Sequence, residues 1–317
     1  MMNNENQQAI EALKQVAMAG IQEQRSSRRW SIFFKIASLL LFLLLIMAII
    51  GSSLAKNGKL TNAKEYTAVV DVNGIIMQGA DASADNIIPA LQDAFQDKKV
   101  KGIILRCNSP GGSPVQSSYV YNEIRRLKEK HKDKKIIAVA VDLCASGGYF
   151  IISAADEIYA NKSSLVGSIG VRMKGFGVVE AMKKIGVENR ELTAGAHKAI
   201  LDPFSPRKPD EEAFVKKLLA TTHKHFIDAV KAGRGDRLKD NPDIFSGLFW
   251  TGEGAKELGL VDGFGSDAYV AREIIKAPVM INFSPKKDLF EKLSRKVGAS
   301  LSSWFSGSQT IMKPALY

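Results

Sequence analysis

Gly102-Ile-Ile-Leu-Arg-Cys-Asn-Ser-Pro-Gly-Gly-Ser113 begins as an apolar run and ends in a diglycine turn. The run has the length and composition of a buried strand, and the residues after it have the pattern of an amphipathic helix. The same order of strand, turn and helix recurs over residues 135–155. Such alternation predicts an α/β fold in which crossover helices join the strands of a parallel sheet.

The expected elements extend this pattern along the chain. Strands are predicted at residues 67–72, 102–106, 135–141 and 157–160, and helices at 84–96, 115–131 and 146–155. A longer helix is predicted from Pro209 to about Ala232, because proline suits the first helical position and Gly233 can end a helix. Four apolar residues are expected to form its packing face: Phe214, Leu218, Phe226 and Val230.

The composition restricts the classes of function open to the chain. Its 317 residues are 45% hydrophobic and 24% charged, which suits a folded protein. The net charge of +11 forms no basic face with interleaved aromatics, so it favours an anionic lipid surface over nucleic acid as a partner. The two cysteines and four histidines form neither CxxC nor HExxH, so no metal or cofactor is predicted. His223 and His225 are expected to be solvated helix residues.

An apolar run near the N-terminus predicts a membrane anchor. Residues 36–50 are uncharged and nearly all apolar, and with their neighbours they reach the roughly 20 residues that span a bilayer. A cleaved signal peptide is the rival, but the polar segment before the run is long for one. We therefore expect a retained, single-pass signal anchor. Arginines before the run place the N-terminus in the cytoplasm and the remaining chain outside the inner membrane.

The chain is expected to contain five segments. They are a cytoplasmic segment (1–30), the transmembrane anchor (31–54), a linker (55–65), one α/β domain (66–280) and a tail (281–317). The apolar spacing of the tail suits an amphipathic helix on a membrane or a neighbouring subunit, but also packing on its own domain. The sequence leaves these alternatives open.

The diglycine turn is suited to bind a negative oxygen. Glycine lets the backbone turn sharply, and the N–H groups at the start of the next helix can face an anion. An oxyanion hole is one use of such a turn. A phosphate loop is another, but the Walker pattern is absent.

Ser146 follows the second strand in Val141-Asp-Leu-Cys-Ala-Ser-Gly-Gly-Tyr-Phe150. Its position is that of a helix N-cap, and in isolation the residue is as well explained by a cap as by a nucleophile. The small neighbours leave space beside the hydroxyl. The N–H groups of Gly112 and Gly147 can also point the same way, toward a crevice where two parallel strands end.

Both cysteines lie beside these turns. Cys144 is a rival nucleophile, but we expect it on the strand side of its turn, as inert packing. Cys107 ends the neighbouring strand, so the two thiols can lie close together. The sequence leaves their pairing open.

A serine nucleophile needs a base, and no histidine lies in a context that suits the task. His197 and Lys198 are adjacent within a largely apolar segment. A lysine acts as a base only when it is neutral, which requires desolvation to lower its pKa from about 10.4. For a lone lysine, a solvated surface charge is the ordinary expectation.

Five strings follow the apolar run in a fixed order. They are NSPGGS (108–113), DLCASGGYF (142–150), GSIGV (167–171), GAHKAILDPF (195–204) and FWTGEGAKELGLVDGFG (249–265). The ordered set resembles signal peptide peptidase A in its short form, a member of the protease IV family (peptidase family S49). The resemblance implies the Clp-protease/crotonase-like fold and a serine endopeptidase with a Ser-Lys dyad.

By position, the resemblance implies a role for each of five residues. Ser146 matches the nucleophile, Lys198 the general base and Ser168 the serine that orients the lysine, while Gly112 and Gly147 match the oxyanion-hole amides. His197 is then a neighbour of the base. The chain has one copy of a domain that the long form duplicates, which implies a homo-oligomeric ring whose sites combine residues of adjacent subunits.

The implied substrates are cleaved signal peptides and other apolar peptides, met at the bacterial inner membrane by a domain on its periplasmic side. Two alternatives use the same fold. A crotonase-type acyl-CoA enzyme would also need diglycine amides, but it would have little use for Ser146 and Lys198. A catalytically silent membrane scaffold is the second alternative.

Overall fold

The structure is a computed structural model of the 317-residue chain, and it describes residues 28–44 and 63–285 together with positions 14, 18 and 47. Contacts divide the chain into two units, Met1–Ala63 and Lys64–Tyr317. Most of the predicted segment 1–30, most of the linker 55–65 and residues 286–317 of the tail lie outside the described residues.

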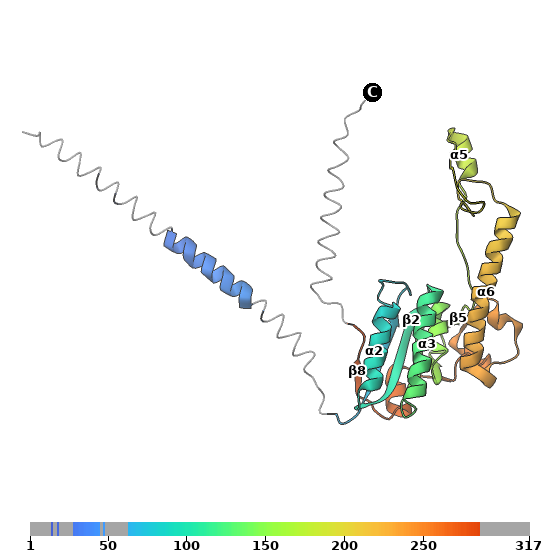
Figure 1. Ribbon diagram of the computed structural model, residues 1–317. Helices are drawn as coiled ribbons and strands as arrows, with labels where there is room; N and C mark the ends of the chain where they lie inside the picture. Colours follow the sequence, from blue (N-terminus) through green and yellow to red (C-terminus); the bar gives the residue numbers. More distant parts are fainter. Residues whose placement is uncertain (1–13, 15–17, 19–27, 45–46, 48–62, 286–317) are drawn as a thin grey trace, which may run out of the picture. The chain divides into compact units, whose positions relative to one another are not determined.

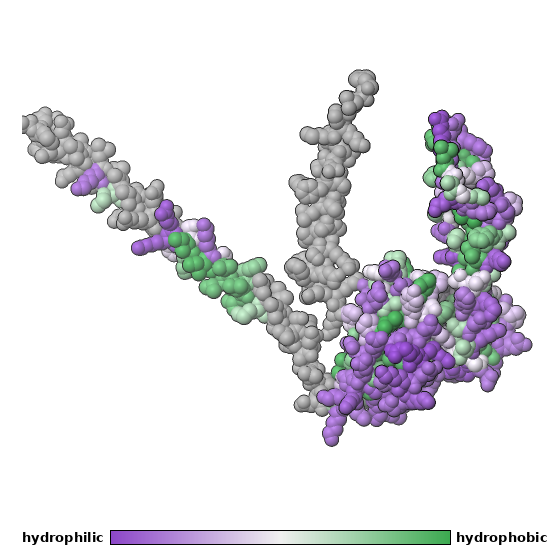
Figure 2. Space-filling model, in the orientation of Figure 1, coloured by the Kyte–Doolittle hydropathy of each residue, from purple (hydrophilic) through white to green (hydrophobic). Residues whose placement is uncertain are grey.

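The first unit contains a described helix over residues 28–44. Its apolar side chains, among them Phe33, Phe34 and Leu41, are exposed, and Figure 2 shows most of this helix as hydrophobic surface. Within the described residues, no helix is both long and apolar enough to cross a membrane. Positions 45, 46 and 48–54 of the predicted anchor lie outside those residues, so the anchor stays a prediction.

The second unit is built on a mostly parallel sheet. Its strands are β1 (Tyr66–Asn73), β2 (Val100–Ser109), β3 (Lys135–Ala145), β4 (Glu157–Ala160), β5 (Leu165–Gly167), β6 (Phe249–Thr251), β7 (Gly263–Phe264) and β8 (Met280–Asn282). The order is β6-β5-β3-β2-β1-β8, and β4 pairs with β3 and β7. The β5–β6 pair is antiparallel, whereas the other strand pairs of the described sheet are parallel. The predicted α/β class is confirmed.

Helices cover both faces of this sheet. The helices of the unit are α2 (Ala84–Gln96), α3 (Pro114–Lys130), α4 (Gly147–Ile152), α5 (Val179–Ile185), α6 (Pro209–Arg234), α7 (Gly252–Glu257) and α8 (Asp267–Tyr269), with short 3₁₀ helices η1 (Gly235–Arg237) and η2 (Pro242–Phe245) and a short π-helix η3 (Val270–Ile274). Of these, α5 lies away from the sheet (Figure 1). Figure 1 shows α2 and α3 on the same face of the sheet. Alternate residues of β1 point to opposite sides: Ala68 and Val70 join the main core with residues of α2 and α3, while Val69 joins a smaller cluster with residues of η3. Burial on both faces explains why the strands are continuous apolar runs.

The sheet divides at β3. Residues 137–140 of this strand pair with β4, and residues 143–145 pair with β5. The last part of β3 therefore pairs with β5 instead of β4 and leads directly to Ser146. The fold places that residue at a strand-to-helix turn, as predicted.

The long helix α6 differs from its prediction in two ways. It continues to Arg234 and is capped by Gly235, while Gly233 allows a close approach: a Cβ there would lie 1.9 Å from the Ser153 carbonyl oxygen. Phe226 and Val230 are buried as predicted, but Phe214 and Leu218 are exposed. The expected packing face is therefore wrong for the N-terminal half of α6.

The N-terminal half of α6 extends away from the sheet, next to the segment that contains α5 (Figure 1). We call residues 171–208 the arm; most of them are exposed, the others are half-buried, and none is fully buried. Figure 1 shows α5 beyond the N-terminal end of α6, away from the sheet. The arm is held by local contacts, such as the hydrogen bond from the Val178 N–H to the Pro203 carbonyl (2.9 Å).

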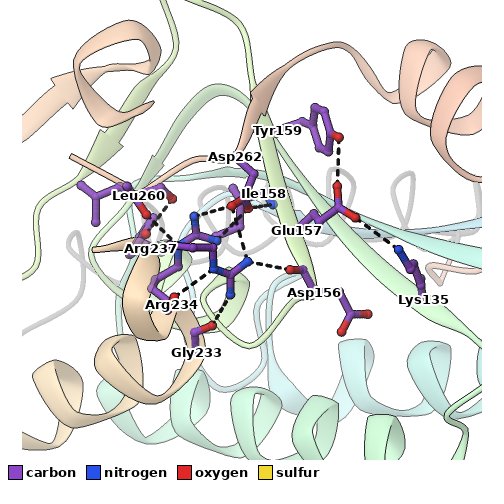
Figure 3. A network of polar contacts seen from close by, with 12 residues as sticks. Lys135, Asp156, Glu157, Ile158, Tyr159, Gly233, Arg234, Arg237, Leu260 and Asp262 are labelled. Atoms are coloured by element: carbon purple, nitrogen blue, oxygen red, sulfur yellow. Dashed lines mark hydrogen bonds and ion pairs between the residues drawn. The ribbon is translucent and has the colours of Figure 1, made fainter. Parts of the chain in front are cut away.

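The opposite end of α6 is fixed to the core by Arg234, a fully buried side chain. Its guanidinium donates two hydrogen bonds of 2.8 Å to Asp262 and one of 2.9 Å to the Gly259 carbonyl. Asp262 also accepts from the Ile158 N–H at 2.7 Å, which joins α6 to β4 (Figure 3). Burial favours a raised pKa for Asp262, but the hydrogen bonds and charges of Arg234 and Arg237 outweigh it and hold that pKa below its usual value.

Candidate active site

The backbone at Ser146 is unlike that of a helix N-cap. Ser146 has φ +53° and ψ −124°, whereas an N-cap residue ordinarily has β-region dihedrals, and its hydroxyl makes no capping hydrogen bond. Non-glycine residues at positive φ are uncommon and gather at functional sites. The strained strand-to-helix turn that exposes a nucleophilic serine is one such site. Of the two roles that the sequence left open, the geometry favours the nucleophile.

The diglycine turn packs directly on the Ser146 turn. A Cβ atom added to Gly111, which has φ +92°, would lie 2.7 Å from both the Gly147 nitrogen and the Ser146 Cβ. One added to Gly112 would lie 2.1 Å from the Ile76 carbonyl oxygen. These contacts leave no room for a side chain at either position.

Two backbone N–H groups at these turns are available to an oxyanion. The Ile76 N–H donates to the Gly111 carbonyl (3.0 Å) and the Ser113 N–H donates to the Ile76 carbonyl (2.7 Å), a pairing that does not use the Gly112 N–H. Gly147 is the first residue of α4, so its N–H has no partner within the helix. The two residues are close, because a Cβ on Gly147 would lie 3.3 Å from the Gly112 nitrogen. Two neighbouring amides of this kind suit an oxyanion hole.

Ser168 lies in a turn that adjoins the Ser146 turn. The Ser146 N–H donates to the Gly167 carbonyl (2.8 Å), and the Ser168 N–H donates to the Leu248 carbonyl (2.7 Å). Ser168 also has a positive φ of +53°. Two serines with strained backbones are therefore held in neighbouring turns.

Cys107 and Cys144 form a disulfide between β2 and β3, and both are fully buried. The bridge resolves the pairing that the sequence left open. Because its sulfur is bonded, Cys144 is no longer a rival nucleophile.

A cavity of about 830 Å³ lies in front of these turns. Four of the five predicted site residues line it: Gly112, Ser146, Gly147 and Ser168. Apolar side chains complete much of the wall, including Ile75, Val171 and Phe226. The cavity thus combines a candidate nucleophile and two amide donors with apolar walls.

Two titratable side chains line the cavity, and sequence reasoning missed both as site residues. They are Arg172 and His223, and no carboxylate is among the lining residues. His223 is half-buried, and its Nε2 lies 3.0 Å from the carbonyl of Ile169, the residue after Ser168. The expectation of a solvated His223 is therefore wrong. The position of His223 within the predicted helix could not indicate this contact, because it joins α6 to a loop 54 residues earlier in the chain.

Lys198 is not among the residues that line the cavity. It lies in the arm with an exposed side chain, next to exposed His197. Within the described residues its side chain makes no hydrogen bond or ion pair, and its N–H donates to the Gly195 carbonyl (3.1 Å). The structure therefore brings together four of the five predicted residues, and the pairing of Ser146 with Lys198 stays a prediction.

Comparisons with known proteins point to a protease family. Residues 128–277 match the profile described as peptidase family S49. A candidate protease of Methanocaldococcus jannaschii is 34% identical over 231 residues, which are 71% of this chain and 73% of that protein. The chloroplastic serine protease SPPA of Arabidopsis thaliana is 30% identical over 258 residues, 78% of this chain and 37% of that protein.

A further similarity is to a much longer protein. The Na⁺/H⁺ antiporter NhaA of Brucella melitensis is 48% identical over 202 residues, 62% of this chain. The chain spans only 27% of the length of that relative. The name antiporter therefore describes that protein and is not carried over to this chain.

Proposed function

From the premise that the chain belongs to peptidase family S49, we propose that it is a membrane-anchored serine endopeptidase in which Ser146 is the nucleophile and Lys198 the general base. The predicted resemblance to signal peptide peptidase A is confirmed by the family profile and by the names of relatives. A protease role follows from the family. The observation that carries the finer proposal is the strained, uncapped Ser146 beside two unused amides.

The proposed reaction is acyl transfer through Ser146. The Ser146 Oγ attacks the peptide carbonyl carbon while Lys198 Nζ accepts the hydroxyl proton, and the lysine then passes that proton to the leaving amine. The carbonyl oxygen, now negative, accepts hydrogen bonds from the Gly112 and Gly147 N–H groups, each worth about 2.7–4 kcal/mol in the transition state. Water hydrolyses the acyl-enzyme. Ser168 would orient the lysine as it enters the cavity.

We propose that Lys198 reaches Ser146 from an adjacent copy in a homo-oligomeric ring. Among the described residues, the Lys198 side chain in the arm has no hydrogen-bond or ion-pair partner, and no lysine lines the cavity around Ser146. Exposed apolar residues on the arm and on α6 supply a surface that a second copy can bury: Met173, Phe176, Leu192, Phe214 and Leu218. A heterologous contact of this kind closes into a ring when the rotation permits.

The anchor and the compartment complete the proposal. The apolar run at residues 36–50 supports a signal anchor in the inner membrane, and the preceding arginines support a periplasmic catalytic domain. The buried disulfide supports the same side, because such bridges persist in oxidising compartments. The apolar cavity walls suit extended apolar peptides, of which cleaved signal peptides are the nearest source for an anchored enzyme.

The test uses Ser146→Ala and Lys198→Ala in the full chain, assayed on an apolar chromogenic peptide and with a fluorophosphonate probe. Both variants are expected to lose cleavage while keeping the wild-type melting temperature. The wild type should be labelled at Ser146. Substantial cleavage by the Lys198 variant would refute the Ser-Lys dyad. A wild type that the probe does not label would favour the catalytically silent membrane scaffold. Binding of acyl-CoA in place of peptide would favour the crotonase-type alternative.

A further inference from the structure

The disulfide lies where the ladder between β2 and β3 is interrupted. Residues up to Cys107 pair in one register, with Cys107 opposite Ala140, and the register then shifts so that Ser109 lies opposite Cys144. Within this gap the Leu143 N–H donates to the Asn108 side-chain oxygen at 3.3 Å. The bridge therefore joins the two strands at a place where regular strand hydrogen bonds do not.

Each half of the bridge precedes one of the amides proposed to form the oxyanion hole. Cys107 leads into the turn that contains Gly112, and Cys144 leads into the turn that contains Gly147. The distance between the two strand ends sets the distance between the two turns. A covalent bond between those ends fixes it.

The packing around the sulfur atoms extends this restraint to the amides. A Cβ on Gly148 would lie 3.2 Å from the Cys107 Sγ, so the first turn of α4 rests on the bridge. Ser109 acts on the other turn: its hydroxyl donates to the Gly74 carbonyl (2.6 Å) and accepts from the Gly111 N–H (3.0 Å). The bridge and the Ser109 hydroxyl together hold both loops to the sheet.

We propose that the Cys107–Cys144 disulfide is a positioning element of the oxyanion hole, so that peptide cleavage depends on the oxidation state of this pair. The inference rests on the proposed function and adds a redox requirement to it. An oxyanion donor must lie within about 2.7–3.1 Å of the oxygen, and a misplacement of about 1 Å can lower a rate about 100-fold. A bridge between the bases of both loops restrains a displacement of that size.

Reduction of the bridge is a two-electron step. A dithiol reductant transfers two electrons and two protons, the S–S bond breaks to give the Cys107 and Cys144 thiols, and the reductant closes into its own disulfide. The thiols no longer restrain the two strand ends. The expected consequence is a lower kcat with little change in KM, because the oxyanion develops only in the transition state.

The experiment compares the full-length wild type with the double variant Cys107→Val/Cys144→Ala, which replaces the bridge by an apolar pair. We expect kcat to fall about 10- to 100-fold, KM to change less than about 2-fold, and affinity for a peptide aldehyde to fall as kcat does. The aldehyde adduct carries an oxyanion, so a role in stability alone would not weaken it. The matched control is Leu91→Ala in α2, a fully buried residue outside the site that should lower the melting temperature and leave kcat unchanged.

Wild-type kcat and aldehyde affinity in the double variant would overturn the inference. If that variant does not accumulate, the wild type is assayed after reduction by a dithiol and again after reoxidation; kcat should fall about 10-fold on reduction and return on reoxidation. Unchanged kcat in wild type whose two thiols are shown to be reduced would likewise overturn the inference. Failure of the proposed function looks different, because the fluorophosphonate would then label neither the wild type nor the variants.

Discussion

Gly111→Ala should separate the geometry of the site from the stability of the fold. The added Cβ would lie 2.7 Å from the Gly147 nitrogen and the Ser146 Cβ and 2.9 Å from the Ala145 carbonyl oxygen. Carbon contacts are ordinarily about 3.5–4.0 Å, so the two turns must separate by about 1 Å. A hydrogen bond of about 2.9 Å that lengthens by that amount is lost.

The expected loss follows from the number of donors affected. Removing one oxyanion donor costs about 2.7–4 kcal/mol of transition-state stabilisation, or about 10²–10³ in kcat. Positive φ adds a separate cost to folding of about 1–2 kcal/mol for alanine. For a domain of this size, that corresponds to a fall in melting temperature of about 2–8 °C.

Gly79→Ala is the matched control for the backbone cost. Gly79 has φ +76°, similar to that of Gly111, but a Cβ there would meet nothing within 4 Å. Gly79→Ala should therefore show the backbone cost alone, and Gly111→Ala should show a larger fall in melting temperature by calorimetry, because its Cβ contacts add to that cost. Cleavage of the chromogenic peptide should fall only in Gly111→Ala, and equal kcat values in the two variants would refute the contact between the turns as the basis of the oxyanion hole.

Three further predictions concern assembly and stability. Ser146→Ala and Lys198→Ala subunits, mixed and reassembled, should regain up to about a quarter of the wild-type cleavage if each site draws on two copies; an inactive mixture would contradict shared sites. Arg234→Met leaves the Asp262 carboxylate without its main partner and should lower the free energy of unfolding by about 3–5 kcal/mol in urea titration, whereas a loss below about 1 kcal/mol would refute the role of this pair. Because the folded pKa of Asp262 is lowered, its contribution to stability is fully present above the unfolded pKa of about 3.9 and is lost as the pH falls through the folded pKa. Asp262→Asn should therefore reduce the fall in melting temperature at acid pH. A pH profile of the melting temperature unchanged from that of the wild type would contradict this role of Asp262.

The periodic elements could be predicted because their signals are local. The helix at residues 84–96 was predicted with its observed bounds, although Pro89 lies inside it. The strand predicted to end at Arg106 continues to Ser109, because Asn108 pairs with Asn73 of β1 and Ser109 pairs with Cys144 of β3 beyond the register shift. A pairing between distant segments leaves no mark in the apolar pattern of either one.

The site was predictable in its residues but not in its arrangement. The ordered motifs indicated Ser146, Ser168 and the two amides, and in the structure these residues line one cavity. The backbone dihedrals of Ser146, which favour a nucleophile over a cap, depend on how the end of β3 pairs with β5. The apolar face of α6 predicted packing but could not indicate whether this chain or another covers it.

If each site draws on two copies as proposed, the arm would make a single copy of the enzyme inactive. A solitary chain would hold its nucleophile in one place and its base in another, and a serine hydroxyl without a base attacks amides poorly. Newly made copies would cleave no peptide while their concentration is low. Cleavage would start only once the local concentration allowed Lys198 of one copy to reach Ser146 of the next. The geometry of a single protomer would thereby make crowding in the bilayer the trigger for proteolysis.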